Sequence, residues 1–273
     1  MADGDGAFFL DTSTQISKTW EDEKIRHDLN NKLSQKPCYS SVYVKNEYKL
    51  KILNDAILVY NTTVDSVTLD EAKPRLDHLM KRIGRRPNEL PYKIFRRFFR
   101  QYNSKPPFLK KLEKLIELEW LNFFLGNIRK SLFNLVKCKS TQDDPCKNRE
   151  NYYVPITSRC SPDCRIDDFL KSQQDALNVL ANIDNTKLDR MNDPNGTLQK
   201  IKSVSTAILG GKSPHGKPCK EISDAVISLE AKASCPTIIL HSMDSDFKLL
   251  GEVLNIPTCV YSKDKILKEI KGW

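Results

Sequence analysis

Ala7-Phe8-Phe9-Leu10 leads directly into Asp11-Thr12-Ser13 near the start of this 273-residue chain. A continuous apolar run of this length favours a strand that is buried on both faces, as strands are in the interior of parallel sheets. No partner strand is evident close to it in the sequence. We therefore expect this strand to pair with segments from the far end of the chain.

The C-terminal quarter of the sequence alternates between helical and strand-like patterns, which predicts a parallel sheet. Helices are expected over residues 221–233, 247–254 and 263–270, and strands over residues 237–240 and 258–260. The fold class that follows is α/β, with a discontinuous core from residues 1–60 and 220–273. Residues 61–219 form a mostly α-helical insertion into that core.

Helix signals occur along the rest of the chain as well. Ser40 or Ser41 can cap a helix that carries Glu47, after a short strand or turn at residues 37–41. Thr68 and Glu71 have the spacing of a capping box. Other helices are expected over residues 19–33, 108–136, 162–183 and 197–209, the last ending at Gly210-Gly211.

The formal net charge of +9 is concentrated in one segment. Residues 81–130 contain fourteen Lys or Arg and four Glu, a balance of +10, so the remainder of the chain sums to −1. A concentrated basic segment attracts polyanions, most commonly nucleic acid.

Acidic residues follow two of the expected strands. Asp11 comes directly after the first strand, and Asp244 and Asp246 come shortly after the strand at residues 237–240. Because functional groups of parallel sheets collect beyond the carboxyl ends of the strands, these acids should share one edge. Glu47, early in a helix after another strand, should face the same edge. Asp224 begins a helix that precedes a strand, so we expect that helix to start at the opposite edge, and Asp224 reaches the site only if the helix is tilted or the site extends along the sheet.

Several carboxylates in one cleft repel one another unless a cation neutralises them. Mg²⁺ and Mn²⁺ take oxygen ligands of this kind. Two such ions about 4 Å apart stabilise the attacking and leaving oxygens of phosphodiester hydrolysis. This chemistry needs carboxylates from distant parts of the chain, and the sequence supplies them at the ends of the expected strands.

Four segments resemble, in the same order, the acidic motifs of PIN-domain nucleases. They are residues 8–13 (FFLDTS), 37–47 (PCYSSVYVKNE), 224–231 (DAVISLEA) and 242–247 (SMDSDF), where Ser242 replaces the Thr of the family's Thr-x-Asp-x-Asp-Phe. The resemblance covers residues 7–60 and 220–262, and the long segment between them departs from the many shorter members. It implies a three-layer α/β core and Mg²⁺- or Mn²⁺-dependent cleavage of single-stranded or structured RNA. The implied metal ligands are Asp11, Glu47, Asp224 and Asp244, with Asp246 as a ligand or its support.

Each of these acids also has a purely structural interpretation. Asp246 could cap a helix, Asp244 could form the turn before it, and Asp224 could favour the positive end of its helix. Glu47 could be a solvated charge, as Glu221, Glu230 and Asp264 are expected to be. Ser13 and Ser242 could orient a carboxylate or a metal-bound water, or could simply form turns.

The basic segment has two interpretations. As a nucleic-acid surface, its arginines would contact phosphates and its aromatic rings could stack on bases. Alternatively, the rings form the buried side of a helix whose solvated side carries the arginines, or an acidic protein covers the patch. The expected phosphate contacts are Arg85, Arg86, Arg96, Arg97 and Arg100.

Four of the eight cysteines lie in the loop-rich region 138–164. Cys138, Cys146, Cys160 and Cys164 could hold a structural Zn²⁺, although their spacing lacks the short C-x2-C form, and reduced thiols are the alternative. The chain is too large to depend on disulfides. It shows neither a secretory signal nor an apolar run of membrane-spanning length, so we expect a cytoplasmic protein.

The function expected from these features is that of a metal-dependent endoribonuclease. Two other interpretations stay open: a DNA-cutting or structure-specific nuclease with the same acids, and a non-catalytic RNA-binding scaffold with a PIN-like core.

Overall fold

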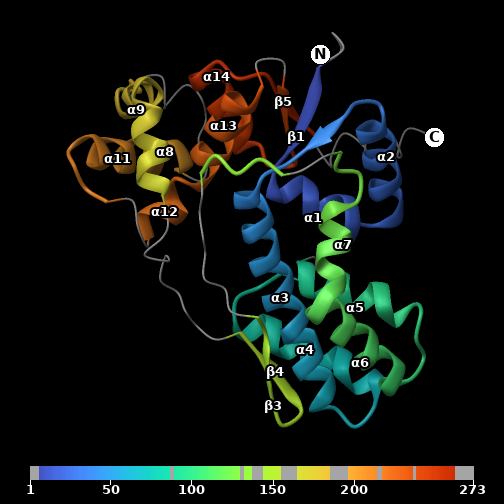
Figure 1. Ribbon diagram of the computed structural model, residues 1–273. Helices are drawn as coiled ribbons and strands as arrows, with labels where there is room; N and C mark the ends of the chain where they lie inside the picture. Colours follow the sequence, from blue (N-terminus) through green and yellow to red (C-terminus); the bar gives the residue numbers. More distant parts are fainter. Residues whose placement is uncertain are drawn as a thin grey trace.

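The computed structural model of the chain describes residues 6–86, 89–129, 132–136, 144–154, 165–184, 196–213, 217–235 and 238–261. At its centre is a parallel four-stranded sheet with the strand order β2-β1-β5-β6 (Figure 1). These strands are β1 (Ala7–Leu10), β2 (Cys38–Tyr39), β5 (Ile238–Ser242) and β6 (Thr258–Val260). The α/β class with a parallel sheet is thus confirmed.

The first strand pairs with both ends of the chain, as its apolar sequence predicts. Phe8 lies opposite Cys38 on β2 and opposite Ile239 on β5, both in parallel register. β5 is extended by two residues beyond the expected strand, so Ser242 still belongs to the sheet and pairs with Val260 of β6. The carboxyl ends of β1 and β5 consequently lie side by side.

Successive side chains of β1 enter two different hydrophobic clusters, since neighbouring residues of a strand point to opposite faces. Phe8 and Leu10 pack in a small cluster with Leu29 and Leu33 of α2 (Glu23–Ser34). Phe9 belongs to the large cluster that continues through α3 (Val42–Val64) and the C-terminal helices. Helices therefore cover both faces of the sheet. Replacing the fully buried Phe9 with Ala would cost about 3–5 kcal/mol of folding free energy.

The chain enters a helix directly after β1, which the sequence analysis did not predict. Helix α1 (Thr12–Trp20) is capped by Asp11, whose side chain accepts a hydrogen bond from the backbone N–H of Thr14. Its first turn is rich in hydroxyl residues of low helix propensity, and this masks the helical pattern. The expected polar helix over residues 19–33 is instead α2, which begins at Glu23.

The first half of the insertion packs on α3 and extends the large cluster below the sheet (Figure 1). It contains α4 (Leu69–Arg82), α5 (Leu90–Phe99), α6 (Lys105–Lys114), the π-helical segment η1 (Leu115–Glu119) and α7 (Trp120–Leu125). Thr68 caps α4 by accepting a hydrogen bond from the N–H of Glu71, as the capping-box spacing predicts. The expected helix over residues 108–136 was too long, because the helical segment ends at Leu125 before Gly126.

The second half of the insertion forms a separate group of helices beside the C-terminal helices (Figure 1). A hairpin of β3 (Cys146–Asn148) and β4 (Asn151–Tyr153) comes first and contacts α3. The helices are α8 (Ile166–Ser172), α9 (Gln174–Ala181), α11 (Thr197–Leu209) and α12 (Lys217–Glu221). Both α9 and α11 contact α14 (Asp246–Leu254), so this half of the insertion packs on the core.

The C-terminal elements follow the expected order. Helix α13 (Ser223–Ser234) leads into β5, and α14 leads into β6. Gly251 allows the close approach of α14 to β6, because a Cβ atom there would lie 2.6 Å from a methyl carbon of Thr258. The helix expected over residues 263–270 lies outside the described residues. Of the helices within the described part of the chain, none has the length and apolar character that a membrane span requires.

Candidate functional site

Asp11 lies at the carboxyl end of β1 and is almost completely buried. One of its carboxylate oxygens accepts the hydrogen bond from Thr14, and the other accepts hydroxyl hydrogen bonds from Ser13 and Ser242, each at 2.7 Å. Burial raises the pKa of Asp11, although these hydrogen bonds act in the opposite direction. Both serines therefore orient this carboxylate, which was one of the roles expected for them.

Glu47 approaches the same point from α3. Its carboxylate accepts a hydrogen bond from the hydroxyl of Thr12, the residue next to Asp11. Burial raises the pKa of Glu47, and the negative charge of Asp11 adds to this effect. Glu47 is thus a desolvated carboxylate beside a second one, and the interpretation of it as a merely solvated charge is wrong.

Asp224 is the acid on which the cluster converges. Burial raises the pKa of Asp224 to about 7, assisted by four acidic neighbours, which in order of decreasing effect are Glu47, Asp244, Asp11 and Asp246. Like charges raise the pKa of a carboxyl group because its ionised form is repelled. The other four acids named from the sequence are therefore within electrostatic range of Asp224.

The expected position of Asp224 at the opposite edge of the sheet was wrong. Helix α13 ends at Ser234 and feeds the amino end of β5, which begins at Ile238. A helix that packs beside the next strand after so short a connection runs antiparallel to it, so α13 starts at the carboxyl edge of the sheet. No tilt is needed to bring Asp224 to the other acids.

Asp244 and Asp246 come from the turn between β5 and α14. Asp244 is exposed, and its carboxylate accepts a hydrogen bond from the backbone N–H of Asp246 at 3.1 Å. The side chain of Asp246 is buried and accepts a hydrogen bond from the hydroxyl of Thr197 at 2.7 Å. Thr197 begins α11, so the insertion contributes a residue to the acidic cluster.

The cluster fits a divalent cation by its donor chemistry and its charge, but the side chains do not converge on one point. Its members are hard oxygen donors, burial raises the pKa of Asp11, Glu47 and Asp224, and the charges of neighbouring acids add to this effect at Glu47 and Asp224. Within the described residues, however, no three acidic, histidine or cysteine side chains are close enough to hold a common ion. Several of the carboxylates instead accept hydrogen bonds from hydroxyl groups, so metal binding requires new side-chain rotamers.

A pocket of about 460 Å³ opens beside the cluster and is bordered by Ser13 and Asp244. Two of its basic residues form ion pairs with buried acids: Arg85 with Asp55, and Lys93 with Glu21 at 2.6 Å. The exposed Lys51 also lines the pocket, one turn after Glu47 on α3, and forms no ion pair with a described residue. A polyanion that reaches the acids through this pocket would meet the ammonium group of Lys51.

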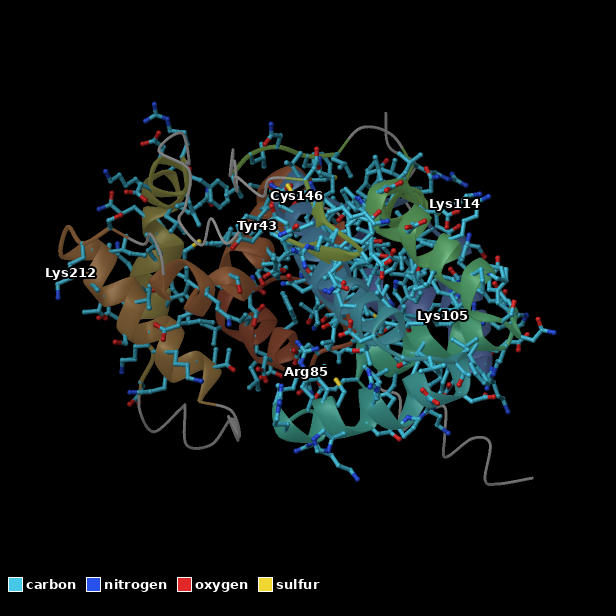
Figure 2. The ribbon with its side chains drawn as sticks, turned by 90° about the horizontal axis from the view of Figure 1, so that it is seen from below. Tyr43, Arg85, Lys105, Lys114, Cys146 and Lys212 are labelled. Carbon is cyan, nitrogen blue, oxygen red and sulfur yellow. The ribbon has the colours of Figure 1, made fainter. Side chains whose placement is uncertain are left out.

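The structure divides the expected arginine contacts into two kinds. Arg86, Arg96 and Arg100 are exposed, whereas Arg85 is engaged with Asp55. Arg97 donates to the backbone carbonyl of Thr19 and lies over two aromatic rings, so it has a structural role. Figure 2 shows Arg85 near the middle of the molecule, whereas Lys105 and Lys114 lie farther from α11.

The aromatic residues of the basic segment belong mostly to the core. Tyr92, Phe95 and Phe98 are buried, and only Phe99 among the rings of α5 is exposed, at 38%. Stacking of several bases along α5 is therefore not supported, and the interpretation of this stripe as the packed side of a helix is confirmed.

Only one of the four expected zinc ligands, Cys146, lies within the described residues. Cys146 lies in β3 and is partly exposed, with its thiol 3.6 Å from the carbonyl oxygen of Asp144. Cys138, Cys160 and Cys164 lie outside the described residues.

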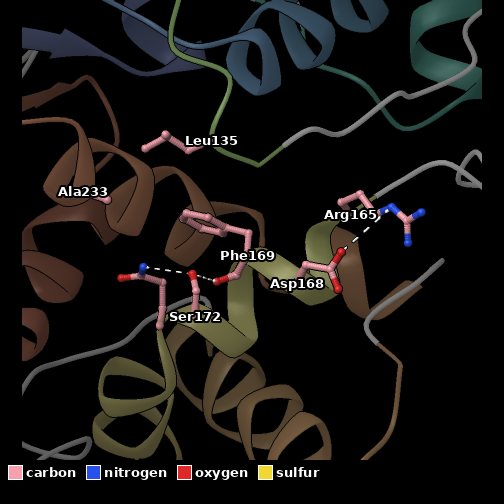
Figure 3. Close-up of a pocket in the computed structure, with 7 residues that line it drawn as sticks. Leu135, Arg165, Asp168, Phe169, Ser172 and Ala233 are labelled. Carbon is pink, nitrogen blue, oxygen red and sulfur yellow. Dashed lines mark hydrogen bonds and ion pairs between the residues drawn. The ribbon is translucent and has the colours of Figure 1, made fainter.

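Two further pockets lie away from the acids. Figure 3 shows one of about 460 Å³ between α8 and the end of α13, where Phe169 and Leu135 provide the apolar part and Arg165 pairs with Asp168. A similar one is lined by residues of α9, α13 and α14. None of the five acids borders either pocket.

Sequence reasoning missed Thr12, Thr197 and Lys51. The hydroxyl next to Asp11 and the cation one helical turn after Glu47 have spacings that could have drawn attention to them. Thr197 carries no such signal, since only the packing of α11 on α14 brings it to Asp246. No family model, curated protein or solved structure matches the chain.

Proposed function

We propose that the chain is a metal-dependent nuclease that hydrolyses phosphodiester bonds, with RNA as the favoured substrate, and that its core is a three-layer PIN-like fold. The observation that supports this most strongly is the electrostatic coupling of four other acids to the buried Asp224 at the carboxyl edge of the sheet. The five acids come from β1, α3, α13 and the β5–α14 turn, and such a concentration of desolvated negative charge is costly without a cation.

Asp11, Glu47, Asp224 and Asp244 would hold one or two Mg²⁺ or Mn²⁺ ions, with Asp246 as a further ligand or as support. When bound, such ions supply electrostatic stabilisation for the oxygens of a phosphodiester under attack. The hydroxyl groups orient the carboxylates: Ser13 and Ser242 hold Asp11, and Thr12 holds Glu47.

The chain's own contribution to substrate binding lies in the pocket beside Asp244. The exposed Lys51 lines it, together with the ion-paired Arg85 and Lys93. We assign the phosphate contact to Lys51 together with the exposed Arg86, Arg96 and Arg100. We also propose a cytoplasmic location, because an endoribonuclease acts where its RNA substrates are found.

The decisive experiment is a cleavage assay with purified protein on matched single-stranded RNA and DNA oligonucleotides. Mn²⁺ and Mg²⁺ are titrated, and each reaction is repeated with excess chelator. We expect cleavage of RNA that depends on the metal and is lost in Asp11→Asn and Asp244→Asn. Glu252→Gln, on the exposed side of α14, serves as the matched control and should cleave as the wild type does.

The outcomes separate the three functional interpretations. Preferential cleavage of DNA would favour the DNA or structure-specific nuclease. Binding of RNA that survives chelation, with no cleavage by any metal, would favour the scaffold. Normal cleavage by either Asp→Asn variant would show that the acids are not the catalytic centre.

A further inference from the structure

Another pocket lies at the other end of α1, where the charged residues are basic. It is open and is lined by residues of α1, α2, α5 and the end of α7, and its volume is about 190 Å³. No carboxylate is found among the described residues that line it. The polar lining consists of three cations and three amides: Lys18, Arg26, Arg97, Asn30, Asn122 and Asn127. Lys18 lies about two helical turns beyond Asp11, ~10 Å along the axis of α1, so this pocket is separate from the acidic cluster.

Lys18 is held in place by neutral groups. Its ammonium group donates to the carbonyl oxygen of Phe124 at 2.8 Å and also to that of Gly126, both at the C-terminal end of α7. The side chain is buried, and this burial lowers the pKa of Lys18 to about 7. These carbonyls accept hydrogen bonds from the ammonium group but supply no negative charge to balance it.

Arg97 is fixed in the same way. Its guanidinium group donates to the carbonyl of Thr19 and lies 5.3 Å from the ring centres of both Trp20 and Phe123. Its cationic neighbour in the pocket is Arg26, and burial together with the charge of Arg26 lowers the pKa of Arg97. Arg26 forms no ion pair with any residue that the structure describes.

Two other partly buried cations of the chain are held differently. Arg85 pairs with Asp55, and Lys93 pairs with Glu21, so those charges are neutralised within the protein. Three cations around one small space repel one another, and an anion placed between them removes that cost. The planar donors of two guanidinium groups match the oxygens of a phosphate particularly well.

The volume of the pocket indicates the size of the group that fits inside it. Pockets for drug-sized ligands begin at roughly 300 Å³. A volume of about 190 Å³ accommodates a phosphate group but not a complete nucleotide. We propose that this pocket binds a phosphate group, either as free inorganic phosphate or as the terminal phosphate of a larger ligand, through Arg26, Arg97 and Lys18. The proposal does not depend on nuclease activity.

The test titrates the full-length protein with inorganic phosphate, using chloride at matched ionic strength as the reference. Binding is measured by calorimetry and by the thermal unfolding midpoint. A ligand that binds only the folded state should raise Tm by about 3–6 °C at tenfold excess over its Kd. We expect Arg26→Ala to weaken phosphate binding at least about tenfold, because charged hydrogen bonds are lost.

Arg26 is the better position to mutate, because Arg97 also packs on Trp20 and its removal could prevent folding. Lys24→Ala is the matched control: it removes one positive charge from the same helix, at an exposed position that does not line the pocket. Arg26→Lys should retain part of the affinity. Equal effects of phosphate and chloride, or equal affinity in Arg26→Ala and Lys24→Ala, would overturn the proposal.

A second arm identifies the source of the phosphate. The same oligonucleotide is compared with a 5′-phosphate and with a 5′-hydroxyl, in the presence of chelator so that it stays intact. A preference for the phosphorylated end that disappears in Arg26→Ala assigns the pocket to the terminus of a nucleic acid. Equal binding of both ends, with inorganic phosphate still bound, assigns it to a small free anion.

Discussion

The two ends of α1 lie in clusters of opposite charge. Asp11 lies at the N-terminal end among four other acids, and Lys18 lies near the C-terminal end beside two arginines. Each sign matches the helix dipole, which favours negative groups at the N-terminus and positive groups at the C-terminus. The dipole compensates only part of the repulsion within each cluster.

The clusters differ in how their charges are held. Hydroxyl groups hold Asp11, Glu47 and Asp246, while carbonyl groups and aromatic rings hold Lys18 and Arg97. A neutral partner holds a charged side chain in place without cancelling its charge, so the charge can still attract a ligand. In the ion pairs elsewhere in the chain, the partner cancels the charge. We infer that one end of α1 takes cations and the other takes anions.

The largest expected loss of RNA cleavage follows from removing one carboxylate from the acids at the N-terminal end of α1. Asp224→Asn should lower the rate of metal-dependent RNA cleavage by at least about 10³-fold, since it deletes the acid to which the other four couple. The fold should persist, because the amide occupies nearly the same volume. Circular dichroism provides the structural control, and near-normal cleavage by a folded variant would refute the role of Asp224.

A smaller effect is expected where a hydroxyl group orients an acid. Thr197→Val removes the hydrogen bond to Asp246 and should reduce cleavage by about 10–100-fold, as the loss of groups that orient metal ligands does. Thr206→Val is the matched control on the same helix, because its hydroxyl bonds only to the backbone carbonyl of Lys202. If both variants lose activity equally, the effect comes from α11 as a whole.

The exposed Lys51 beside the acids allows a finer test of this comparison. Lys51→Ala should weaken the binding of single-stranded RNA about three- to tenfold, and the slope of log affinity against log salt should fall by about 0.7. The measurement uses fluorescence anisotropy in Ca²⁺. Lys49→Ala, on the same helix but paired with Asp144, removes the same charge away from the pocket. Indistinguishable slopes for the two variants would exclude Lys51 as a phosphate contact.

The smallest expected effect is a pH dependence of thermal stability that arises from the acids at the N-terminal end of α1. The pKa of Asp224 is about 7 in the folded protein, above its ordinary value. Between these two values the folded state binds more protons than the unfolded state, so the metal-free protein should lose stability as the pH rises from 5 to 8. We expect Tm to fall by a few degrees over this range, less in Asp224→Asn, and Mn²⁺ to restore it at pH 8. A Tm difference between pH 5 and 8 that is the same in Asp224→Asn would contradict this account.

Much of the core could be predicted from the sequence, because its signals are local. The apolar run of β1, the capping residue Ser41 of α3 and the limits of α11 were predicted at their observed positions. Helix α1 was missed, since its hydroxyl-rich first turn resembles a turn more than a helix. To place Asp224, one must know in which direction α13 runs relative to the strands, and this direction was inferred incorrectly from the order of elements along the chain.

Residues that depend on distant packing could not be predicted. Glu230 was expected on the surface, yet it is fully buried on α13 and accepts a hydrogen bond from the N–H of Leu135. The cations of the phosphate pocket come from α1, α2 and α5, and no spacing along the chain links Arg26 to Arg97. Such sites appear only when the helices are placed in space.

Because β1 pairs with β5, the central sheet cannot be completed on the ribosome until the C-terminal part of the chain has been synthesised. Ala7 lies opposite Ile238, so most of the chain must be translated before β1 can pair with β5. Contacts between such distant residues form late, after the intervening chain has been made. Three of the five acids are synthesised only with the last quarter of the sequence. A growing polypeptide therefore carries Asp11 and Glu47 without their partners, and the complete set of acids arises only as synthesis nears its end, which would keep a ribonuclease inactive beside the message that encodes it.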